Sequence, residues 1–425
     1  MNGKILIIYA HDLGYPPRIT NDDMLYCFER YSKCLCYYVN VAFGVPGYLK
    51  DIDFDLIIFH DFFLCKRSLP KRFRKIYENS LILKQFKGLR IATAQDEFLQ
   101  SKKLCELIDE FDIRHVFSVS PPSEWKKIYK GIDRKKVTLH NVLCGYIERG
   151  HIKKINAWEG MIKKRSIDIG YRASSPRFSL GYFNYMKFKI GEVVKQNANK
   201  FGLIIDISSE FNDTLLGTNW YKFLLKSKYM LGVEGGASIL DDDGSIQKCV
   251  FQYMAKHPNS AFSEVEKICF KGKDGTFQYF MITPRHFEAC MAKTCQILLE
   301  GNYSGILKPG KHYLELKKDF SNLDDVLHKV SIDSQRQGIV DQAYKDIVMS
   351  GKYTYDKFVR LVLQKSFGNG YKWRAITSSD RRIYKRNKKR ERIIWTIIPI
   401  KSFFIMTIIK VLPKRLFYRM VGAFS

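Results

Sequence analysis

Short, continuously apolar runs recur along this chain, and their spacing constrains the fold more than any other feature. The N-terminal part holds six of them: Lys4–Tyr9, Cys36–Val41, Leu56–Phe59, Leu89–Thr93, His115–Ser120 and Val137–Val142. Polar stretches with a helical pattern, such as Asp22–Cys34 and Phe98–Phe111, separate several of these runs. Buried parallel strands joined by crossover helices have this pattern. We therefore predict a doubly wound α/β domain over residues 1–150.

A second set of alternating runs begins after the charged stretch Glu148–Arg165. Its predicted strands are Asp168–Tyr171, Leu203–Ile207, Tyr229–Val233 and Phe277–Thr283, and its predicted helices are Tyr185–Lys200, His286–Leu299, Leu323–Val330, Ile339–Ser350 and Tyr355–Gln364. A chain of 425 residues is also too long for one compact core. We expect two tandem Rossmann-like domains, the second over residues 166–365, that face a common cleft. Ligands of such sheets lie beyond the carboxyl ends of the strands.

The tail, residues 371–425, differs from the rest in charge. It holds fifteen Lys or Arg and two acidic residues, a net of +13 within a formal total of +28. Ile393–Leu412 is long and apolar enough to cross a bilayer, but Pro399, Lys401 and Lys410 would be costly at its centre. We predict a basic amphipathic tail whose helices lie in the plane of an anionic membrane surface. A spanning helix, and a helix docked on the body with a solvated basic face, remain open.

The charge outside the tail is moderate, which suits anionic substrates such as nucleotide sugars and lipid phosphates. A nucleic-acid binder would carry an identifiable recognition module, and the sequence has none, so no nucleic-acid partner is expected. The ten cysteines form no CxxC pair, and no secretory signal precedes the first apolar run. We therefore expect packing thiols in a reducing cytosol.

The stretch Val233–Gly244, VEGGASILDDDG, has three candidate interpretations. It lacks the lysine of a phosphate-binding P-loop. The aspartates Asp241–Asp243 before Gly244 fit a turn, and a DxD-type metal site is the alternative. We expect no essential metal or other cofactor. Glu234 and Gly235, at the end of a predicted strand, are expected to contact a ligand.

Several segments resemble a known family. FEACMAKTCQILLEGNYSGIL, IGYRA, GVEGGAS, GILKPGKHYLELKKDFSNLDDV and AYKDIVMSGKYTYDKFV in the second half, with LIIFHDFFL, ATAQDEF and SVSPPSEW in the first, are similar to bacterial GT-B glycosyltransferases of surface-polysaccharide (lipopolysaccharide, capsule or exopolysaccharide) synthesis. The resemblance covers residues 1–365. It implies that Glu288, on a proline-led helix, hydrogen-bonds the ribose of a nucleotide-sugar donor. The family often has another glutamate where this chain has Phe280, and Glu234 is the candidate to replace it.

Other donor contacts are predicted from the positions of residues relative to the predicted strands and helices. Arg172, after a strand, and Lys187, on the next helix, are placed to neutralise a departing diphosphate, and a surface cation pair is the alternative. Arg285 and the backbone N–H groups of Thr283–Phe287 lie at a helix start, where anions bind. His312 and Tyr313 follow a flexible Lys-Pro-Gly segment and are candidates to line the sugar.

The first domain would hold the acceptor and, in an inverting enzyme, a base. His11 follows the first predicted strand, and Asp96 and Glu97 follow the fourth. A histidine held by a carboxylate is a common means of activating a hydroxyl. His11 is the first candidate for the base, with Asp96 as its partner, and His60 with Asp61 is the rival pair.

These residues favour a glycosyltransferase that is cytoplasmic and peripheral on the inner face of the cytoplasmic membrane. It would move sugar from a nucleotide-sugar donor to a lipid-linked or growing surface glycan. One alternative is a non-catalytic polyanion or nucleic-acid binding protein that acts through its basic tail. Another is a non-catalytic module that binds a sugar or a nucleotide.

Overall fold

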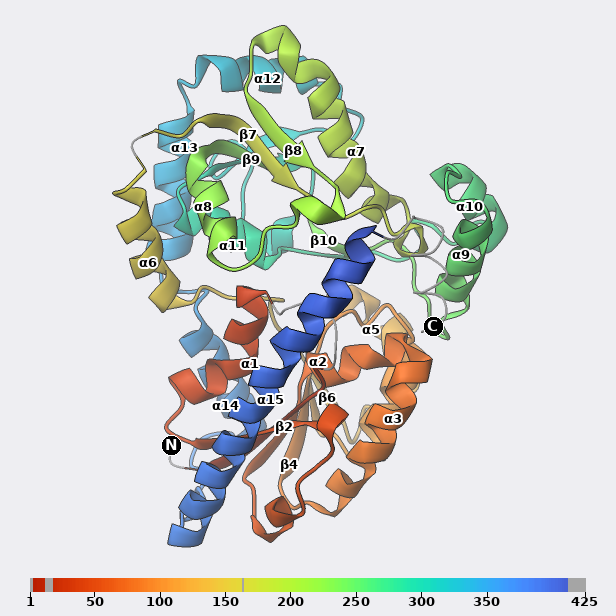
Figure 1. Ribbon diagram of the computed structural model, residues 1–425, viewed down its shortest axis with the longest axis vertical. Coiled ribbons are helices and arrows are strands. Elements are labelled where there is room, and N and C mark those ends of the chain that lie inside the picture. Colours follow the sequence, from red (N-terminus) through yellow and green to blue (C-terminus); the bar gives the residue numbers. More distant parts are fainter. Residues whose placement is uncertain (1–2, 12–17, 163, 412–425) are drawn as a thin grey trace.

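Six parallel strands form the first domain in the computed structural model, which describes residues 3–11, 18–162 and 164–411 (Figure 1). The strand order is β2-β1-β3-β4-β5-β6. The strands are β1 (Lys4–Tyr9), β2 (Leu35–Asn40), β3 (Leu56–Phe59), β4 (Leu89–Ala94), β5 (His115–Ser118) and β6 (Thr138–Asn141). They coincide with the six predicted runs to within about two residues at each end. The order reverses between β1 and β3, and ligands of doubly wound sheets bind at such a point.

Helices cover this sheet on both faces. They are α1 (Ile19–Tyr31), α2 (Asp61–Leu64), α3 (Pro70–Ser80), α4 (Ser101–Glu110) and α5 (Trp125–Ile128), with a short 3-10 turn, η1 (Val41–Phe43), after β2. Strands β1 and β3 are fully buried along their length, which explains why they read as continuous apolar runs.

The second domain has a parallel five-stranded sheet in the order β13-β12-β9-β7-β8. Its strands are β7 (Ile167–Arg172), β8 (Ile205–Ser208), β9 (Ser227–Gly232), β12 (Cys295–Leu299) and β13 (Leu314–Leu316), and its helices include α7 (Tyr182–Asn197), α8 (Thr218–Lys226), α11 (Pro284–Met291), α12 (Leu323–Ile332) and α13 (Arg336–Ala343). The structure therefore has two tandem Rossmann-like domains, as predicted.

The prediction of one helix over His286–Leu299 is wrong for the second half of that range. Helix α11 ends at Met291, Lys293 adopts a positive φ of 49°, and the chain then enters β12 between β9 and β13. A short apolar run such as CQILL fits a buried helix or a buried strand equally well, and periodicity does not separate the two.

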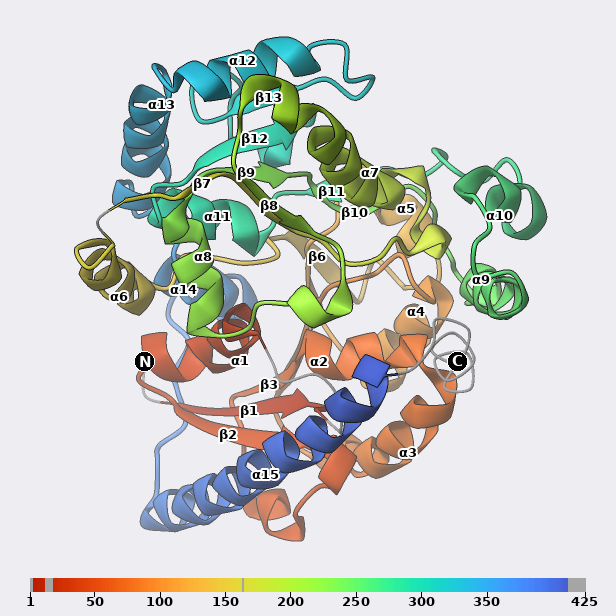
Figure 2. The ribbon, with the colours of Figure 1, turned by 45° about the horizontal axis from the view of Figure 1, so that its top comes forward.

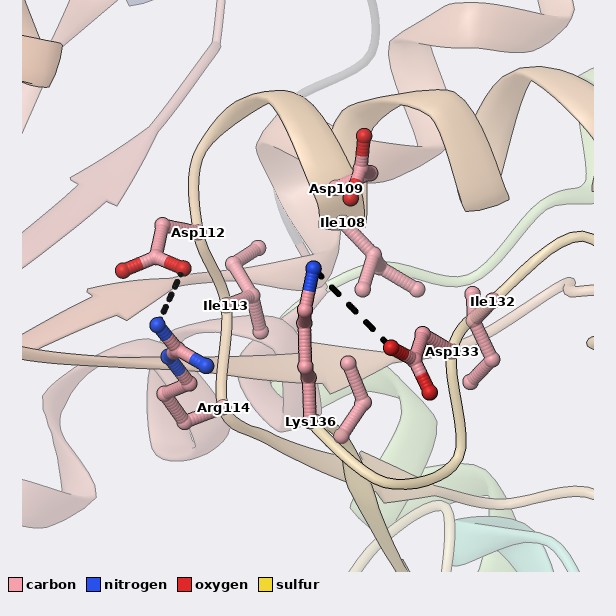
Figure 3. Close-up of a pocket in the computed structure, with 9 residues that line it drawn as sticks. Ile108, Asp109, Asp112, Ile113, Arg114, Ile132, Asp133 and Lys136 are labelled. Carbon is pink, nitrogen blue, oxygen red and sulfur yellow. Dashed lines mark ion pairs between the residues drawn. The ribbon is translucent and has the colours of Figure 1, made fainter.

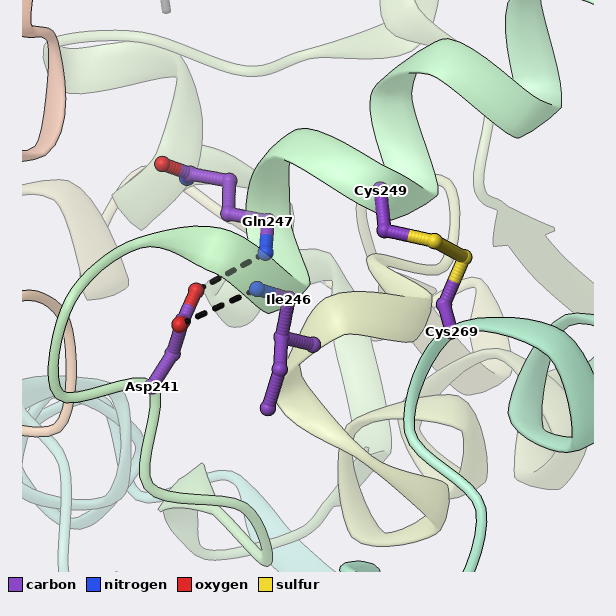
Figure 4. Close-up of a disulfide and its surroundings, with 5 residues drawn as sticks. All are labelled: Asp241, Ile246, Gln247, Cys249 and Cys269. Carbon is purple, nitrogen blue, oxygen red and sulfur yellow. Dashed lines mark hydrogen bonds between the residues drawn. A yellow bond between two sulfur atoms is a disulfide. The ribbon is translucent and has the colours of Figure 1, made fainter.

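A helical hairpin projects from the second domain beside the first (Figures 1 and 2). Helices α9 (Ser245–Lys256) and α10 (Phe262–Cys269) are inserted between β10 (Gly235–Ala237) and β11 (Tyr279–Met281), which pair antiparallel. A disulfide joins Cys249 to Cys269 (Figure 4). The expectation that all ten cysteines are packing thiols is therefore wrong for this pair, because the hairpin fold brings together two cysteines that lie 20 positions apart.

The chain returns to the first domain after residue 350. Helix α6 (Arg149–Glu159) leads into the second domain, and α14 (Tyr355–Phe367) packs against α1. Tyr355, Phe358 and Val362 belong to the apolar core of the first domain. The expected boundary at residue 365 is therefore corrected, since α14 completes the first domain.

The described part of the tail is a long helix, α15 (Ser378–Val411), that packs along the edge strand β2 (Figure 1). The side-chain amide of Asn387 bonds both backbone groups of Tyr38, at 3.0 and 2.9 Å. Lys4 pairs with the buried Asp380 at 3.2 Å, and Tyr9 donates to Glu391 at 2.5 Å. These bonds protect an edge that would otherwise be unpaired.

The docked helix is one of the alternatives left open by the sequence. Among residues 3–411, gaps excepted, no helix combines the length and the hydrophobicity that a membrane crossing needs. Residues 412–425, which the predicted membrane-associating tail also includes, lie outside the described residues.

Candidate functional site

The carboxyl ends of the two sheets meet between the domains. Glu97, after β4, accepts a hydrogen bond from the Tyr279 hydroxyl on β11. The Cys144 thiol, after β6, donates to the Ile282 carbonyl at 3.1 Å. These contacts hold together the two regions where such sheets bind ligands.

Asp96 lies at this junction in an unusual conformation. Its φ of 48° is in the left-handed region, which costs a non-glycine residue free energy and is a recurrent feature of functional sites. Its side chain is exposed, yet burial among the surrounding protein raises its pKa.

Two cations of the second domain act on this carboxylate, and a third lies near one of them. Arg177 and Lys187 act electrostatically on Asp96, and Arg285 and Arg177 act on Lys187. Burial, followed by the nearby Arg285, lowers the pKa of Lys187 to about 8. Within the described residues none of the three forms an ion pair with a carboxylate. Crowded, unpaired cations of this kind favour an anion between them.

Arg285 is held in place by its neighbours. One guanidinium nitrogen donates to the Arg172 carbonyl at 2.7 Å, and the group lies over the Trp220 ring at 5.3 Å. The remaining N–H groups leave this side chain able to bind an anion, because an arginine has five donors.

Arg172 is placed differently from the expectation. Its guanidinium pairs with Asp206 at 2.8 Å and donates to the carbonyls of Asp206 and Asp213 at 2.9 and 3.1 Å. This side chain braces β7 against β8, and Arg177 takes the place beside Lys187 that Arg172 was expected to fill.

Glu288 lies on α11 and its side chain is buried. It accepts from the Trp220 indole at 2.8 Å and from the Tyr221 hydroxyl at 3.4 Å. Burial raises the pKa of this carboxyl, and the indole bond opposes that rise. A carboxylate has about four acceptor positions, so these two contacts do not exhaust it.

Glu234 and Gly235 have partners within the second domain. Glu234 accepts from the Tyr303 backbone N–H at 2.7 Å, which organises the loop after β12. A Cβ at Gly235 would come within 2.6 Å of Thr283, and a Cβ at Gly236 would collide with the Tyr279 carbonyl. Close backbone packing between β10 and β11 therefore explains the paired glycines.

The three aspartates of VEGGASILDDDG form a turn and a helix start. Asp241 accepts from the backbone N–H groups of Ile246 and Gln247 at 3.2 and 2.8 Å, at the first turn of α9 (Figure 4). Asp242 pairs with Lys130 at 2.7 Å, and Asp243 accepts from Ser245 at 2.9 Å. Within the described residues no cluster of three or more His, Cys, Asp or Glu has the arrangement of a metal site.

Of the two candidate histidines of the first domain, His11 lies beside the tail helix and His60 lies beside Asp61. The His11 ring stacks on Trp395 of α15, with centroids 5.4 Å apart, and its Nε2 is buried. His60 Nδ1 lies 2.7 Å from Asp61 and accepts from the Phe62 N–H at 3.2 Å. Asp61 also acts on Asp96, so the rival pair lies nearer the facing cations than the sequence alone suggested.

His312 has a local role in the structure. It accepts from the Lys308 N–H at 3.2 Å, and its Nε2 lies 3.0 Å from Asp346. Tyr313 is buried in the core around α11. The His312 side chain fixes the Lys308–Gly310 turn against Asp346, in the segment after α13.

A small cavity lies at the opposite end of the first sheet (Figure 3). Its walls include Arg114 and Val137, which directly precede β5 and β6, and Asp112 and Lys136. Its volume of about 20 Å³ holds little more than one water molecule. It lies at the amino ends of the strands and is separate from the site.

Sequence reasoning missed Arg177 and Trp395. Arg177 comes shortly before α7, in the loop after β7, where a cation can face a ligand. Trp395 belongs to a stripe with Asn387, Glu391 and Ile398 at helical spacing, and the polar members of that stripe were the signal of a docked helix.

No family model and no curated protein matches this chain. Several solved structures are similar to it. Anabaena HepE in complex with UDP-glucose has a TM-score of 0.45 and 10% identity, over 85% of this chain and 100% of that one. T4 phage β-glucosyltransferase has 0.45 and 13% over 85% and 99%, and AviGT4, a glycosyltransferase involved in avilamycin A biosynthesis, has 0.43 and 9% over 88% and 100%.

Proposed function

We propose that this chain is a glycosyltransferase that uses a nucleotide-sugar donor. The observation that carries the proposal is a group of three cations that form no ion pair within the described residues. Arg177 and Lys187 act electrostatically on Asp96, at the carboxyl end of β4, and Arg285 acts on Lys187. A donor diphosphate would lie among the cations, with its sugar directed toward the first domain.

Each group has a role in the reaction. The acceptor hydroxyl oxygen forms a bond to the anomeric carbon as the bond from that carbon to the diphosphate oxygen breaks. Asp96 takes the hydroxyl proton, since a raised pKa makes a carboxylate a better base. The cations stabilise the negative charge that grows on the leaving diphosphate.

Of the three remaining candidates for donor contacts, only Glu288 keeps its expected role in the proposal. Glu288, oriented by Trp220, would hydrogen-bond the ribose hydroxyls. Glu234 and His312 would act from behind, by holding the loops after β12 and before β13. Of the three, Glu288 alone is proposed to touch the donor.

The acceptor and the location extend the proposal. We infer a lipid-linked or growing surface glycan as acceptor, and a position on the inner face of the cytoplasmic membrane. The basic tail supports this view. No nucleic-acid partner is proposed. We also propose that turnover needs no metal, because Asp241, Asp242 and Asp243 each have a protein partner.

Calorimetry with UDP-, GDP-, dTDP- and CMP-sugars tests donor binding. At least one donor should bind, and Lys187→Met should weaken it by about 10–100-fold because a charged hydrogen bond is lost. Lys195→Met, on the same helix and paired with Glu192, is the matched control. If no donor binds, or if Lys187→Met binds as tightly as the parent, the proposal is wrong. Turnover that EDTA abolishes and Mg²⁺ restores would contradict the metal-free mechanism.

A further inference from the structure

The outer face of α15 is strongly basic. Its exposed cations are Arg381, Arg382, Lys385, Arg386, Lys389 and Arg392. The two acidic residues of this helix, Asp380 and Glu391, are buried against Lys4 and Tyr9. Within the described residues of α15, no carboxylate therefore neutralises the outer face.

A second basic helix lies beside it. Helix α3, the turn η1 and α15 are side by side on the same side of the first sheet (Figures 1 and 2). Arg390 donates to the Phe43 and Gly44 carbonyls at 2.9 Å each, and Asn79 of α3 donates to the Val41 carbonyl at 2.9 Å. The turn η1 thus bridges the two helices.

Helix α3 is amphipathic. Phe73 and Ile76 are buried, whereas its exposed charged residues are Lys71, Arg74, Lys75 and Glu78. The cations of α3 therefore extend the charge of α15 across η1 into one surface. We call this surface the basic face: α15 from Arg381 to Ile397, Phe43, and α3.

Apolar side chains are exposed within the basic face. Phe43 is 36% exposed, Ile393 53% and Ile397 37%. Large apolar groups among cations fit a bilayer interface, where they enter the acyl boundary while the cations meet anionic headgroups. A nucleic-acid surface would instead present stacking aromatics or a groove along the phosphates.

We infer that the basic face, α3 and Phe43 included, is the surface by which this protein binds an anionic lipid bilayer. The inference deepens the proposed function, because it names the surface through which a lipid-linked acceptor would be reached. Trp395, two residues after Ile393, stacks on His11 at the carboxyl end of β1. A bilayer against α15 therefore lies next to the acceptor side of the site.

Vesicle flotation of the full-length protein tests the surface. We expect binding to phosphatidylcholine vesicles with about 30% phosphatidylglycerol and little to pure phosphatidylcholine, since each near-surface cation contributes about fivefold. Lys385→Gln with Lys389→Gln should weaken binding by about 25-fold, and Lys71→Gln with Lys75→Gln by at least about fivefold. Lys153→Gln with Lys154→Gln, two exposed cations of α6 on another side, is the matched control and should bind as the parent does.

Each outcome either supports or contradicts the inference. Parent-like binding by the α3 variant would remove α3 from the surface and overturn the inference, as would equal binding to both vesicle types. Loss of oligonucleotide binding without loss of vesicle binding in the α15 variant would assign the face to nucleic acid. Flotation uses neither donor nor acceptor, so failure of the proposed transferase function, measured by donor calorimetry, is a separate result.

Discussion

At the residue scale, the proposed role of Asp96 as the general base gives a prediction about the transfer rate. Asp96→Asn should lower the transfer rate by about 10²–10⁴-fold, the usual contribution of a general base, and leave donor affinity nearly unchanged. Because burial raises the pKa of Asp96, the base loses its proton at a higher pH than an ordinary aspartate. The rate should therefore rise with pH, and its acid limb should lie above the usual aspartate range.

Initial rates across pH check this prediction, with His11→Ala as the comparison. The His11 ring stacks on Trp395, so its loss should affect the rate less than the loss of Asp96. Parent-like turnover of Asp96→Asn together with a slow His11→Ala would assign the base to His11.

The buried Glu97 gives a residue-scale prediction about stability. It accepts bonds from Ser118 at 2.7 Å and from Tyr279 of the other domain. Tyr279→Phe should lower the free energy of unfolding by about 1–3 kcal/mol, because a buried carboxylate loses a donor. Urea denaturation measures the change. Tyr253→Phe, which removes a similar bond to Glu264 on the exposed hairpin, should change it by less than about 0.5 kcal/mol.

At the scale of elements, α15 belongs to the first domain. Asn387→Ala removes both bonds to Tyr38 and should lower the free energy of unfolding by about 1–3 kcal/mol, since two buried backbone groups lose their partner. Lys385→Ala, exposed on the same helix, is the control and should be neutral within about 0.5 kcal/mol. Equal denaturation midpoints for Asn387→Ala and the parent would contradict the docking.

The hairpin of α9 and α10 should depend on its disulfide. Closing a loop of about 20 residues restricts the unfolded chain by roughly 3 kcal/mol. Cys249→Ser with Cys269→Ser should therefore speed amide hydrogen exchange in α9 and α10. Exchange in α12, which lies in another part of the second domain, should not change. Equal exchange rates in α9 and α10 of the parent and the variant would mean that the apolar cluster around Phe262 is sufficient to stabilise the hairpin.

The sequence predicted elements better than it predicted the site. Strands such as Lys4–Tyr9 and Leu56–Phe59 were found because they are buried on both faces and read as unbroken apolar runs. Short strands such as Leu314–Leu316 were missed because three residues show no period. Asp96 was found by its place after a strand and Lys187 by its place on the helix that follows one. The pairing of Arg172 depends on Asp206 of the neighbouring strand, which one-dimensional spacing does not reveal.

At the scale of the whole molecule, the first domain is built from both ends of the chain. Ile147 and Thr354 form a β-bridge where the chain leaves and returns, and α14 fills the first core. Residues 1–150 expressed alone should therefore be insoluble or molten. Joining them by a short linker to residues 351–425 should restore a cooperative unfolding transition. Circular dichroism during thermal melting distinguishes the two, and a folded 1–150 fragment would contradict this account.

The same crossing has a consequence for synthesis. Strands β1–β6 leave the ribosome before the second domain, yet the edge strand and the core of the first domain lack α14 and α15 until residues 355–411 have been made. At about 5–20 residues per second, the roughly 200 residues of the second domain take about 10–40 s to translate. During that interval β2 carries an uncovered edge and the hollow for Tyr355 is open, so the nascent chain needs protection from aggregation. The first sheet is made before the second domain, but it can become native only after the second domain has been made.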